Sequence, residues 1–475
     1  MKIKVRLSIW LCVSMLTGCS FSFGNPLNTS GLTGNGDGNP QELTPDFSYA
    51  YEEQTYAILV NQIGYRPGDA KVAILQGSNL EESFTVYEKD TNRAVFFGTL
   101  KEAGPMEYGR ADNESGSSLY LADFSELEEA GSYYVFHKTL GYSTPFSIGE
   151  SVYDSLEKYL LEQLAVENRN TVSLCYQLAG MMLTLELYSE QIQNLEEVHR
   201  ILQEKIELLQ KAQDEESGSV YETIPQEAGN LDMAAEEASD EEYILSGYIV
   251  PVISLEASAE YAGVMAMYSC YIEGIDRTAA NQYSRLAQKA FSSITRSLDG
   301  VSFDAGYFAA SYLYKNTLYA KYGQITGQYL AMEEEQKSYT EYDFTLFGDY
   351  AYLTGRQGIN LEWSKQLMNK VMKQAEEISL AGSRENYYVS EKREFHDSDG
   401  MLQDMSVMAL VNYVITNHEY STLLKNYLDY FLGRNPQARC LVEGFGDREP
   451  LAGQEGILNR SYMALMYLLL QSTKG

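Results

Sequence analysis

Positively charged residues are scarce in this sequence. Lysine and arginine number 35 against 67 aspartate and glutamate residues in a chain of 475, which gives a formal net charge of −32 at pH 7. Nucleic-acid binding depends on basic side chains that displace counterions from phosphates, and a chain this acidic is repelled by polyanions. The charge therefore argues against nucleic acid as a partner.

Cysteine and histidine are also few, with five and four residues respectively. Beyond the first 20 positions only Cys175, Cys270 and Cys440 remain, an odd number at wide spacing that predicts no disulfide framework and no metal knuckle. No two histidines have the spacing of a pair of metal ligands. We therefore expect neither a metal site nor a cofactor. The four histidines are His137, His199, His396 and His418.

The N-terminus has the composition of a secretory signal. Lys2, Lys4 and Arg6 precede an apolar run over residues 7–16, which is too short to span a bilayer. Residues 16–19 (LTGC) resemble a bacterial lipobox, in which cleavage before the cysteine exposes it to lipids. We predict a signal peptide over residues 1–18 and a lipid anchor at Cys19 that holds the protein in the bacterial cell envelope, on the extracytoplasmic side of the membrane. An ordinary signal peptide that happens to end in cysteine is the alternative.

Composition then divides the chain further. Residues 19–54 are rich in Gly, Asn, Ser and Pro without periodicity, which predicts a flexible tether. Short β-rich runs separated by turn residues follow over residues 55–149 and predict a small antiparallel sandwich. The expected strands are residues 56–62, 71–75, 83–88, 94–100, 118–122 and 132–137.

From residue 150 to residue 475 the apolar period becomes helical. No proline occurs between Pro251 and Pro436, so long uninterrupted helices are allowed there. The pattern predicts eleven or twelve helices paired into an α/α toroid, with an acidic loop over residues 214–254. Small residues from Ala259 to Cys270 share one helical face and predict a close helix contact.

Several short blocks resemble a known family. Residues 58–67 (ILVNQIGYRP), 123–125 (DFS), 131–135 (GSYYV) and 143–148 (STPFSI) look like the immunoglobulin-like domain that precedes many glycoside hydrolase family 9 catalytic domains. Residues 428–436 (LDYFLGRNP) and 444–446 (GFG) resemble the late part of that catalytic domain. The resemblance implies a multidomain protein, an immunoglobulin-like sandwich followed by a six-hairpin α/α toroid.

The resemblance also implies a chemistry. The family consists mainly of inverting endo-β-1,4-glucanases, and inversion requires a general acid and a general base roughly 6.5–9.5 Å apart. Glu455, followed four positions later by Asn459, has the placement of the family's acid, so the resemblance makes Glu455 the candidate general acid. It also implies β-glucan or an oligosaccharide as the ligand.

The family's motif for the base is missing. Its Asp-Ala-Gly-Asp sequence belongs after the first toroid helix, where this chain reads Asn168-Arg169-Asn170. Residues 304–306 (DAG) are a partial match far too late in the chain, and the family's His-His-Arg element is absent. Beyond the signal peptide the one tryptophan is Trp363, although indole is the largest aromatic platform for a sugar. The base is therefore unknown.

Three functions follow as hypotheses. The first is a degenerate, surface-anchored relative, a pseudoenzyme that binds carbohydrate without cleaving it, and the residues favour this hypothesis. The second is an active inverting hydrolase with Glu455 as its acid. The third, a solute-binding lipoprotein, lacks the alternating strand and helix pattern it requires. Residues 396–400 (HDSDG) form one further polar cluster, in which Asp399 is interpreted as a helix cap.

Overall fold

The computed structural model describes residues 56–105, 118–225, 252–355, 361–384, 387, 389, 398–447 and 458–474. The chain divides into two compact units, Met1–Ala50 and Tyr51–Gly475. All of the described residues belong to the second unit. The predicted signal peptide, the predicted anchor Cys19 and the predicted tether lie outside the described residues.

Between residues 58 and 148 the described residues form ten strands in two sheets. The first sheet has the order β1-β3-β7-β6, and the second has the order β2-β10-β8-β4-β5 with β9 paired to β8. Every pair of neighbours is antiparallel except β2 with β10. The strands are β1 Ile58–Leu59, β2 Gly64–Tyr65, β3 Val72–Gly77, β4 Ser83–Glu88, β5 Ala94–Thr99, β6 Lys101–Pro105, β7 Ser118–Asp123, β8 Gly131–His137, β9 Gly141–Tyr142 and β10 Phe146–Ile148.

Five of the six predicted strands correspond to β3, β4, β5, β7 and β8. The predicted run over residues 56–62 shortens to β1, because Asn61 and Gln62 turn toward other partners. Strands β2 and β9 are two residues long, which is too short for an alternating pattern to be visible.

Both faces of the first sheet are covered. In β3, Ala73 and Leu75 lie in the sandwich core, while Ile74 between them packs into the core of the helical domain. Successive side chains of a strand point to opposite faces, so the unbroken apolar run of β3 is explained by burial on both sides.

Twelve α-helices follow among the described residues, and they confirm the predicted fold class. Helix α13 contacts α2, α2 contacts α5, α5 contacts α7, α7 contacts α9, and α11 contacts α13. The helices are α1 Asp154–Ala165, α2 Thr171–Tyr188, α3 Leu195–Gln210, α5 Leu255–Ile272, α6 Arg277–Ile294, α7 Phe303–Thr317, α8 Ala320–Leu330, α9 Thr345–Leu353, α10 Leu361–Arg384, α11 Ser398–Val414, α12 Ser421–Phe431 and α13 Met463–Ser472.

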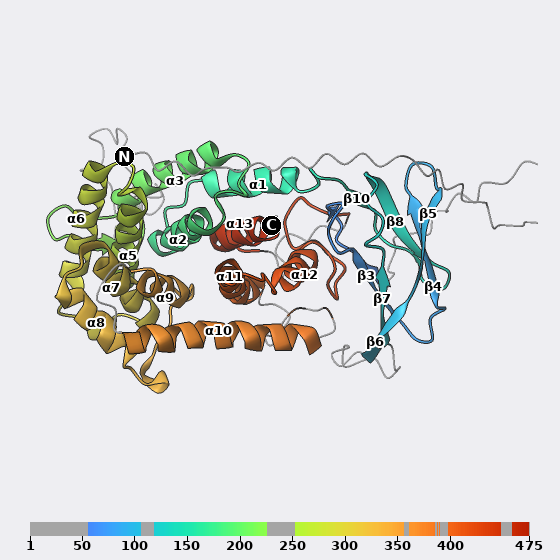
Figure 1. The fold of residues 1–475 in the computed structure, drawn as a ribbon. Helices are drawn as coiled ribbons and strands as arrows, with labels where there is room; N and C mark the ends of the chain where they lie inside the picture. The colour runs from blue at the N-terminus through green and yellow to red at the C-terminus, as the bar shows by residue number, and fades with distance from the viewer. Residues whose placement is uncertain are drawn as a thin grey trace, which may run out of the picture. The chain divides into compact units, whose positions relative to one another are not determined.

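The helices alternate along the chain between inner and outer positions. All ten residues of α13 are buried, which is the pattern of a helix surrounded by others. The buried residues of α6, in contrast, form one stripe with Ala280, Ala287 and Ile294. Figure 1 shows the long outer helix α10 running beside α9 and α11, both of which it contacts.

The predicted close contact on α5 is confirmed. A Cβ atom on Gly263 would lie 2.3 Å from Cε1 of Phe308 on α7, a separation that real contacts do not allow. The small residue therefore sets the spacing of these two inner helices.

The region over residues 214–254, predicted as one long loop, begins and ends in paired strands. Strand β11 (Val220–Tyr221) pairs antiparallel with β12 (Ile253–Ser254), and residues 226–251 lie outside the described residues. Each strand is only two residues long. A strand this short has no recognisable sequence pattern, so it is identified only by its pairing in the structure.

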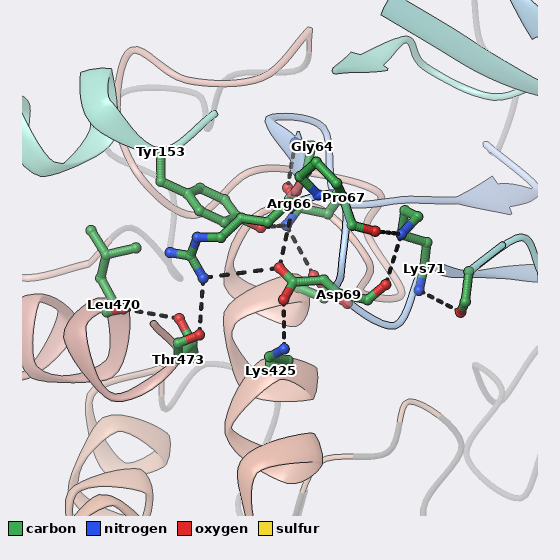
Figure 2. Close-up of polar contacts among 12 residues, drawn as sticks. Gly64, Arg66, Pro67, Asp69, Lys71, Tyr153, Lys425, Leu470 and Thr473 are labelled. Carbon is green, nitrogen blue, oxygen red and sulfur yellow. Dashed lines mark hydrogen bonds and ion pairs between the residues drawn. The ribbon is translucent and has the colours of Figure 1, made fainter. Parts of the chain in front are cut away.

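The two sequence blocks near opposite ends of the chain lie against each other. The Gln62 amide N–H donates to the Leu432 carbonyl at 2.8 Å, and its side-chain amide donates to the Ala438 carbonyl at 2.7 Å. Figure 2 shows Arg66 near Tyr153 and Thr473: its guanidinium lies 4.8 Å from the Tyr153 ring centroid and donates to the Thr473 carbonyl at 2.9 Å. The residues of these two blocks therefore form a contact between the sandwich and the helical domain.

No helix in the described part of the chain combines the length and the apolarity needed to cross a bilayer.

Candidate functional site

The candidate acid Glu455 lies outside the described residues, as do its neighbours over 448–457. The described chain resumes at Leu458, and the Asn459 side chain caps the short helix Arg460–Tyr462 by accepting from the Ser461 amide at 3.0 Å. The Ser461 hydroxyl lies 2.6 Å from the Ser173 hydroxyl at the start of α2. The segment that follows Glu455 in sequence is therefore joined to the N-terminus of α2.

Residues 166–170 connect α1 to α2, at the place where the resemblance puts the base. Asn170 caps α2 by accepting from the Ser173 amide at 2.9 Å, an ordinary role for asparagine. The backbone of Arg169 accepts from the Ile224 amide at 2.8 Å, and its guanidinium donates to the Pro225 carbonyl at 2.9 Å. These contacts hold the connection against residues 222–225.

The one carboxylate in this connection belongs to Glu167. It forms an ion pair with Arg169, and its side chain is 58% exposed. Beneath the connection, the buried Lys205 donates to the Val166 carbonyl. Burial lowers the pKa of Lys205 to about 8. The Glu167 carboxylate is thus part of an ion pair at the surface.

An aromatic cluster lies where the N-terminal parts of the inner helices meet. The buried Tyr176 of α2 is at its centre, with ring centroids of its neighbours between 5.2 and 5.9 Å away in edge-on or tilted contacts. We call it the Tyr176 cluster. Its members are Tyr176, Tyr342, Phe344, Phe347 and Tyr462.

The polar groups that border the Tyr176 cluster are mostly neutral. The Gln403 amide donates to the Tyr342 carbonyl at 3.3 Å and to the Tyr462 hydroxyl at 3.4 Å. The Tyr342 hydroxyl lies 3.3 Å from the Ser461 hydroxyl. Hydroxyls and amides of this kind orient one another, and none of them supplies a base.

Two carboxylates influence Tyr176. Burial raises the pKa of Tyr176 well above its usual value, and the nearby Tyr462, Asp343 and Asp399 raise it further. Asp343 has a positive φ of 38° and accepts from the Thr345 amide at 3.0 Å. Asp399, which the sequence singled out, lies in the first turn of α11, and its neighbours His396 and Asp397 lie outside the described residues. Asp343 was missed because nothing in its local sequence marks it.

Asp304, from the partial match to the family's base motif, has a structural role. It is fully buried, and its carboxylate accepts from the Thr340 amide at 2.9 Å, the Thr340 hydroxyl at 2.6 Å and the Phe344 amide at 3.1 Å. Since these three donors satisfy it, Asp304 holds the segment that enters α9.

The remaining residues noted in the sequence lie elsewhere. Trp363 is on the outer helix α10, outside the Tyr176 cluster. Within the described ranges, no group of three or more His, Cys, Asp or Glu side chains is arranged to hold a metal ion.

Comparison with known proteins matches both domains. Residues 53–141 match the cellulase N-terminal ig-like domain, and residues 167–457, more than half of the chain, match glycosyl hydrolase family 9. Endoglucanase D of Acetivibrio thermocellus is 30% identical over 120 residues, which is 25% of this chain and 18% of that protein. The matched segment thus spans less than a fifth of this relative.

Solved structures share the fold. A metagenome-derived glycoside hydrolase family 9 endoglucanase has a TM-score of 0.70 at 16% identity and covers 88% of this chain and 98% of its own. AaCel9A, solved in complex with cellobiose-like isofagomine, has a TM-score of 0.69 at 14% identity and covers 88% and 99%. Identity this low supports the fold alone, whereas the family match covers most of the toroid. The chain therefore belongs to glycosyl hydrolase family 9 and carries an N-terminal immunoglobulin-like domain.

Proposed function

We propose that this protein binds β-glucan oligosaccharides at the bacterial cell surface without hydrolysing them. The observation that carries the proposal is the short connection between α1 and α2. An inverting hydrolase needs an ionised carboxylate to activate water, roughly 6.5–9.5 Å from the acid, and the resemblance to the family puts that carboxylate in this connection. The one carboxylate of the connection, on Glu167, is exposed and paired with Arg169.

The other side chains of the connection serve structure. Asn168 donates to the Ser173 hydroxyl at 2.8 Å, and Asn170 caps α2. Amides of this kind do not accept a proton from water at neutral pH. An acid without its base can still lie in a binding site, but it does not complete the reaction.

The ligand class is supported by family membership and by the AaCel9A complex with cellobiose-like isofagomine. The location is supported by the N-terminal sequence alone. Cleavage before Cys19 would leave a lipidated cysteine and a tether ahead of the folded domains. In cells grown with labelled palmitate, the wild-type chain should take up label and Cys19→Ala should not. Equal labelling would exclude the anchor.

Activity and binding are measured on the same protein. We expect isothermal calorimetry with cellotetraose to give a saturable heat, while incubation with soluble β-glucan gives no new reducing ends. The matched variant is Glu455→Gln, which keeps the size of the side chain and removes the acid. Reducing ends that the wild type produces and Glu455→Gln does not would overturn the proposal.

An active hydrolase is the second candidate, and the pair Asp343 and Asp399 favours it. Both carboxylates raise the pKa of the buried Tyr176. Asp343 precedes the inner helix α9, and Asp399 lies in the first turn of the inner helix α11. In this case Asp343→Asn or Asp399→Asn would abolish reducing-end formation. If neither variant changes a measurable activity, these two residues are not the base.

A further inference from the structure

A pocket opens between outer helices on the flank of the toroid, outside the Tyr176 cluster. Its lining residues come from α7, α8, α9 and α10 and from the segment between α8 and α9. Figure 1 shows these four helices near one another in the helical domain. Its volume is about 210 Å³. The lining residues used below are Phe303, Tyr307, Lys337, Asp349, Trp363, Gln366 and Lys370.

The aromatic wall of the pocket is built around the tryptophan. A Cβ atom on Gly327 of α8 would lie 2.4 Å from Cη2 of Trp363, so the indole lies directly on the backbone of the neighbouring helix. The glycine leaves room for this ring position. Next to it, Phe303 and Tyr307 are stacked with centroids 5.5 Å apart and planes at 12°.

The polar wall is centred on Asp349, whose side chain is only 4% exposed. Its carboxylate accepts from the Tyr307 hydroxyl at 2.8 Å and pairs with the Lys370 ammonium at 3.2 Å. Burial raises the pKa of Asp349, while the Lys370 charge opposes the shift. A buried carboxylate held by a tyrosine and a lysine is a fixed acceptor at the pocket wall.

Charge at the pocket is balanced. Lys370 is paired with Asp349, and Lys337, which lies 4.8 Å from the Phe303 ring centroid, is paired with Glu334 at 2.8 Å. Because each lysine is paired with a carboxylate, the pocket has no excess positive charge that would favour an anionic ligand. The chain as a whole is strongly acidic, which also disfavours an anionic ligand.

Size and surface chemistry select the ligand. A cavity of about 150 Å³ is enough for a benzene ring, so a volume of about 210 Å³ admits one six-membered ring with part of its substituents. Flat apolar surface beside a few fixed polar groups is the usual composition of a site for a small ligand. A pyranose has both features, because its C–H face is apolar and its hydroxyls point outward.

We propose that this pocket binds one pyranose unit of a neutral oligosaccharide, with the C–H face of the ring on Trp363 and hydroxyls at Asp349, Gln366 and Lys370. The inference rests on the proposed function for its ligand class, and it adds a second site apart from the Tyr176 cluster. A chain held at both places would follow the flank of the toroid.

Tryptophan fluorescence tests the pocket directly. The full chain has two tryptophans, Trp10 and Trp363, so in full-length Trp10→Phe the emission comes from Trp363 alone. We expect cellotetraose to change this emission saturably. Gln366→Ala should weaken the affinity about 2- to 10-fold, the loss of one hydrogen bond. Met368→Ala, on the same helix but outside the pocket lining, should leave the affinity unchanged.

Calorimetry separates the pocket from the proposed function. Trp363→Ala should lose one component of cellotetraose binding. Gln366→Ala should weaken the same component, and it keeps the test valid if Trp363→Ala folds poorly. If the binding heat is unchanged in both variants and Trp363 emission does not respond, the proposal that the pocket binds a pyranose is wrong, while the proposed function stands. Absence of any heat and any emission change would overturn both. A saturable change in emission without any reducing ends supports both.

Discussion

The side-chain amide of Asn61 donates to Oδ1 of Asp429 at 2.9 Å, across 368 positions of sequence. Both residues are buried, and Asp429 also pairs with Arg434 at 3.2 Å. Asn61 donates a second bond to the Tyr153 hydroxyl at 3.0 Å. The sandwich and the helices are therefore joined by a buried polar network, in which the loss of one partner leaves a charge incompletely paired.

Asn61→Ala should lower the free energy of unfolding by about 1–3 kcal/mol, because it leaves the buried Asp429 carboxylate without one of its donors. Denaturant unfolding measures the effect. Asn417→Ala, which removes an exposed asparagine paired with Glu419, is the control and should have little effect. Equal stabilities of the two variants would contradict the role of the network.

Asp429 should also make stability depend on pH. Burial raises its pKa from 3.8 to about 6, against the opposing effects of Arg434 and Asn61. The folded state then binds more protons than the unfolded state between these values, so the free energy of unfolding falls as the pH rises from about 4 to about 6, by about 3 kcal/mol from this group. Above that range Asp429 is ionised in both the folded and the unfolded state, so its contribution to the free energy of unfolding is constant.

The comparison that isolates this group is wild type against Asp429→Asn. The stability of the wild type relative to the variant should decrease as the pH rises through the window and should be flat near neutral pH. A difference that is the same at every pH would show that Asp429 does not titrate in this range.

Asp304→Asn should destabilise the protein by about 1–3 kcal/mol, since an amide nitrogen replaces an oxygen that accepts from Thr340 or Phe344. The affinity of the folded variant for cellotetraose should stay within about twofold of the wild type, because the residue is fully buried. Asp299→Asn at an exposed position is the control. A large change in affinity with intact stability would assign Asp304 to the binding site instead.

Glu260→Met should stabilise the protein by about 1–3 kcal/mol. Both carboxyl oxygens of Glu260 are buried and accept no hydrogen bond from any residue that the structure describes. Burial, with Asp304 and Glu256 nearby, raises the pKa of Glu260 well above its usual value. Methionine has a similar volume and no polar atom to bury. Thermal unfolding should show a higher Tm for this variant, whereas exposed Glu196→Met should leave it unchanged. A lower Tm for Glu260→Met would mean that the carboxyl has a stabilising partner.

Local patterns account for most of the elements. Short β-rich runs bounded by turn residues marked β3, β4, β5, β7 and β8, and helical periodicity without proline marked the toroid. Both signals come from near neighbours in the chain, whose side chains share a face. Short strands such as β11 and β12 have no such signal, because two residues do not make a period.

Sequence alone determined the two-domain architecture, the family and the absence of the family's base motif at residues 168–170. The tertiary structure was needed to show that residues 58–67 and 428–436 form a domain contact and that Asp304 is a structural acceptor. It was also needed to show that Asp343 and Asp399 both raise the pKa of Tyr176, and that Trp363 lines a flank pocket with Asp349. These groups are far apart in sequence and are brought together by the packing of the helices on one another and on the sandwich. Their proximity depends on how helices pack and on which residue, such as Gly327, leaves space, and no local pattern encodes that.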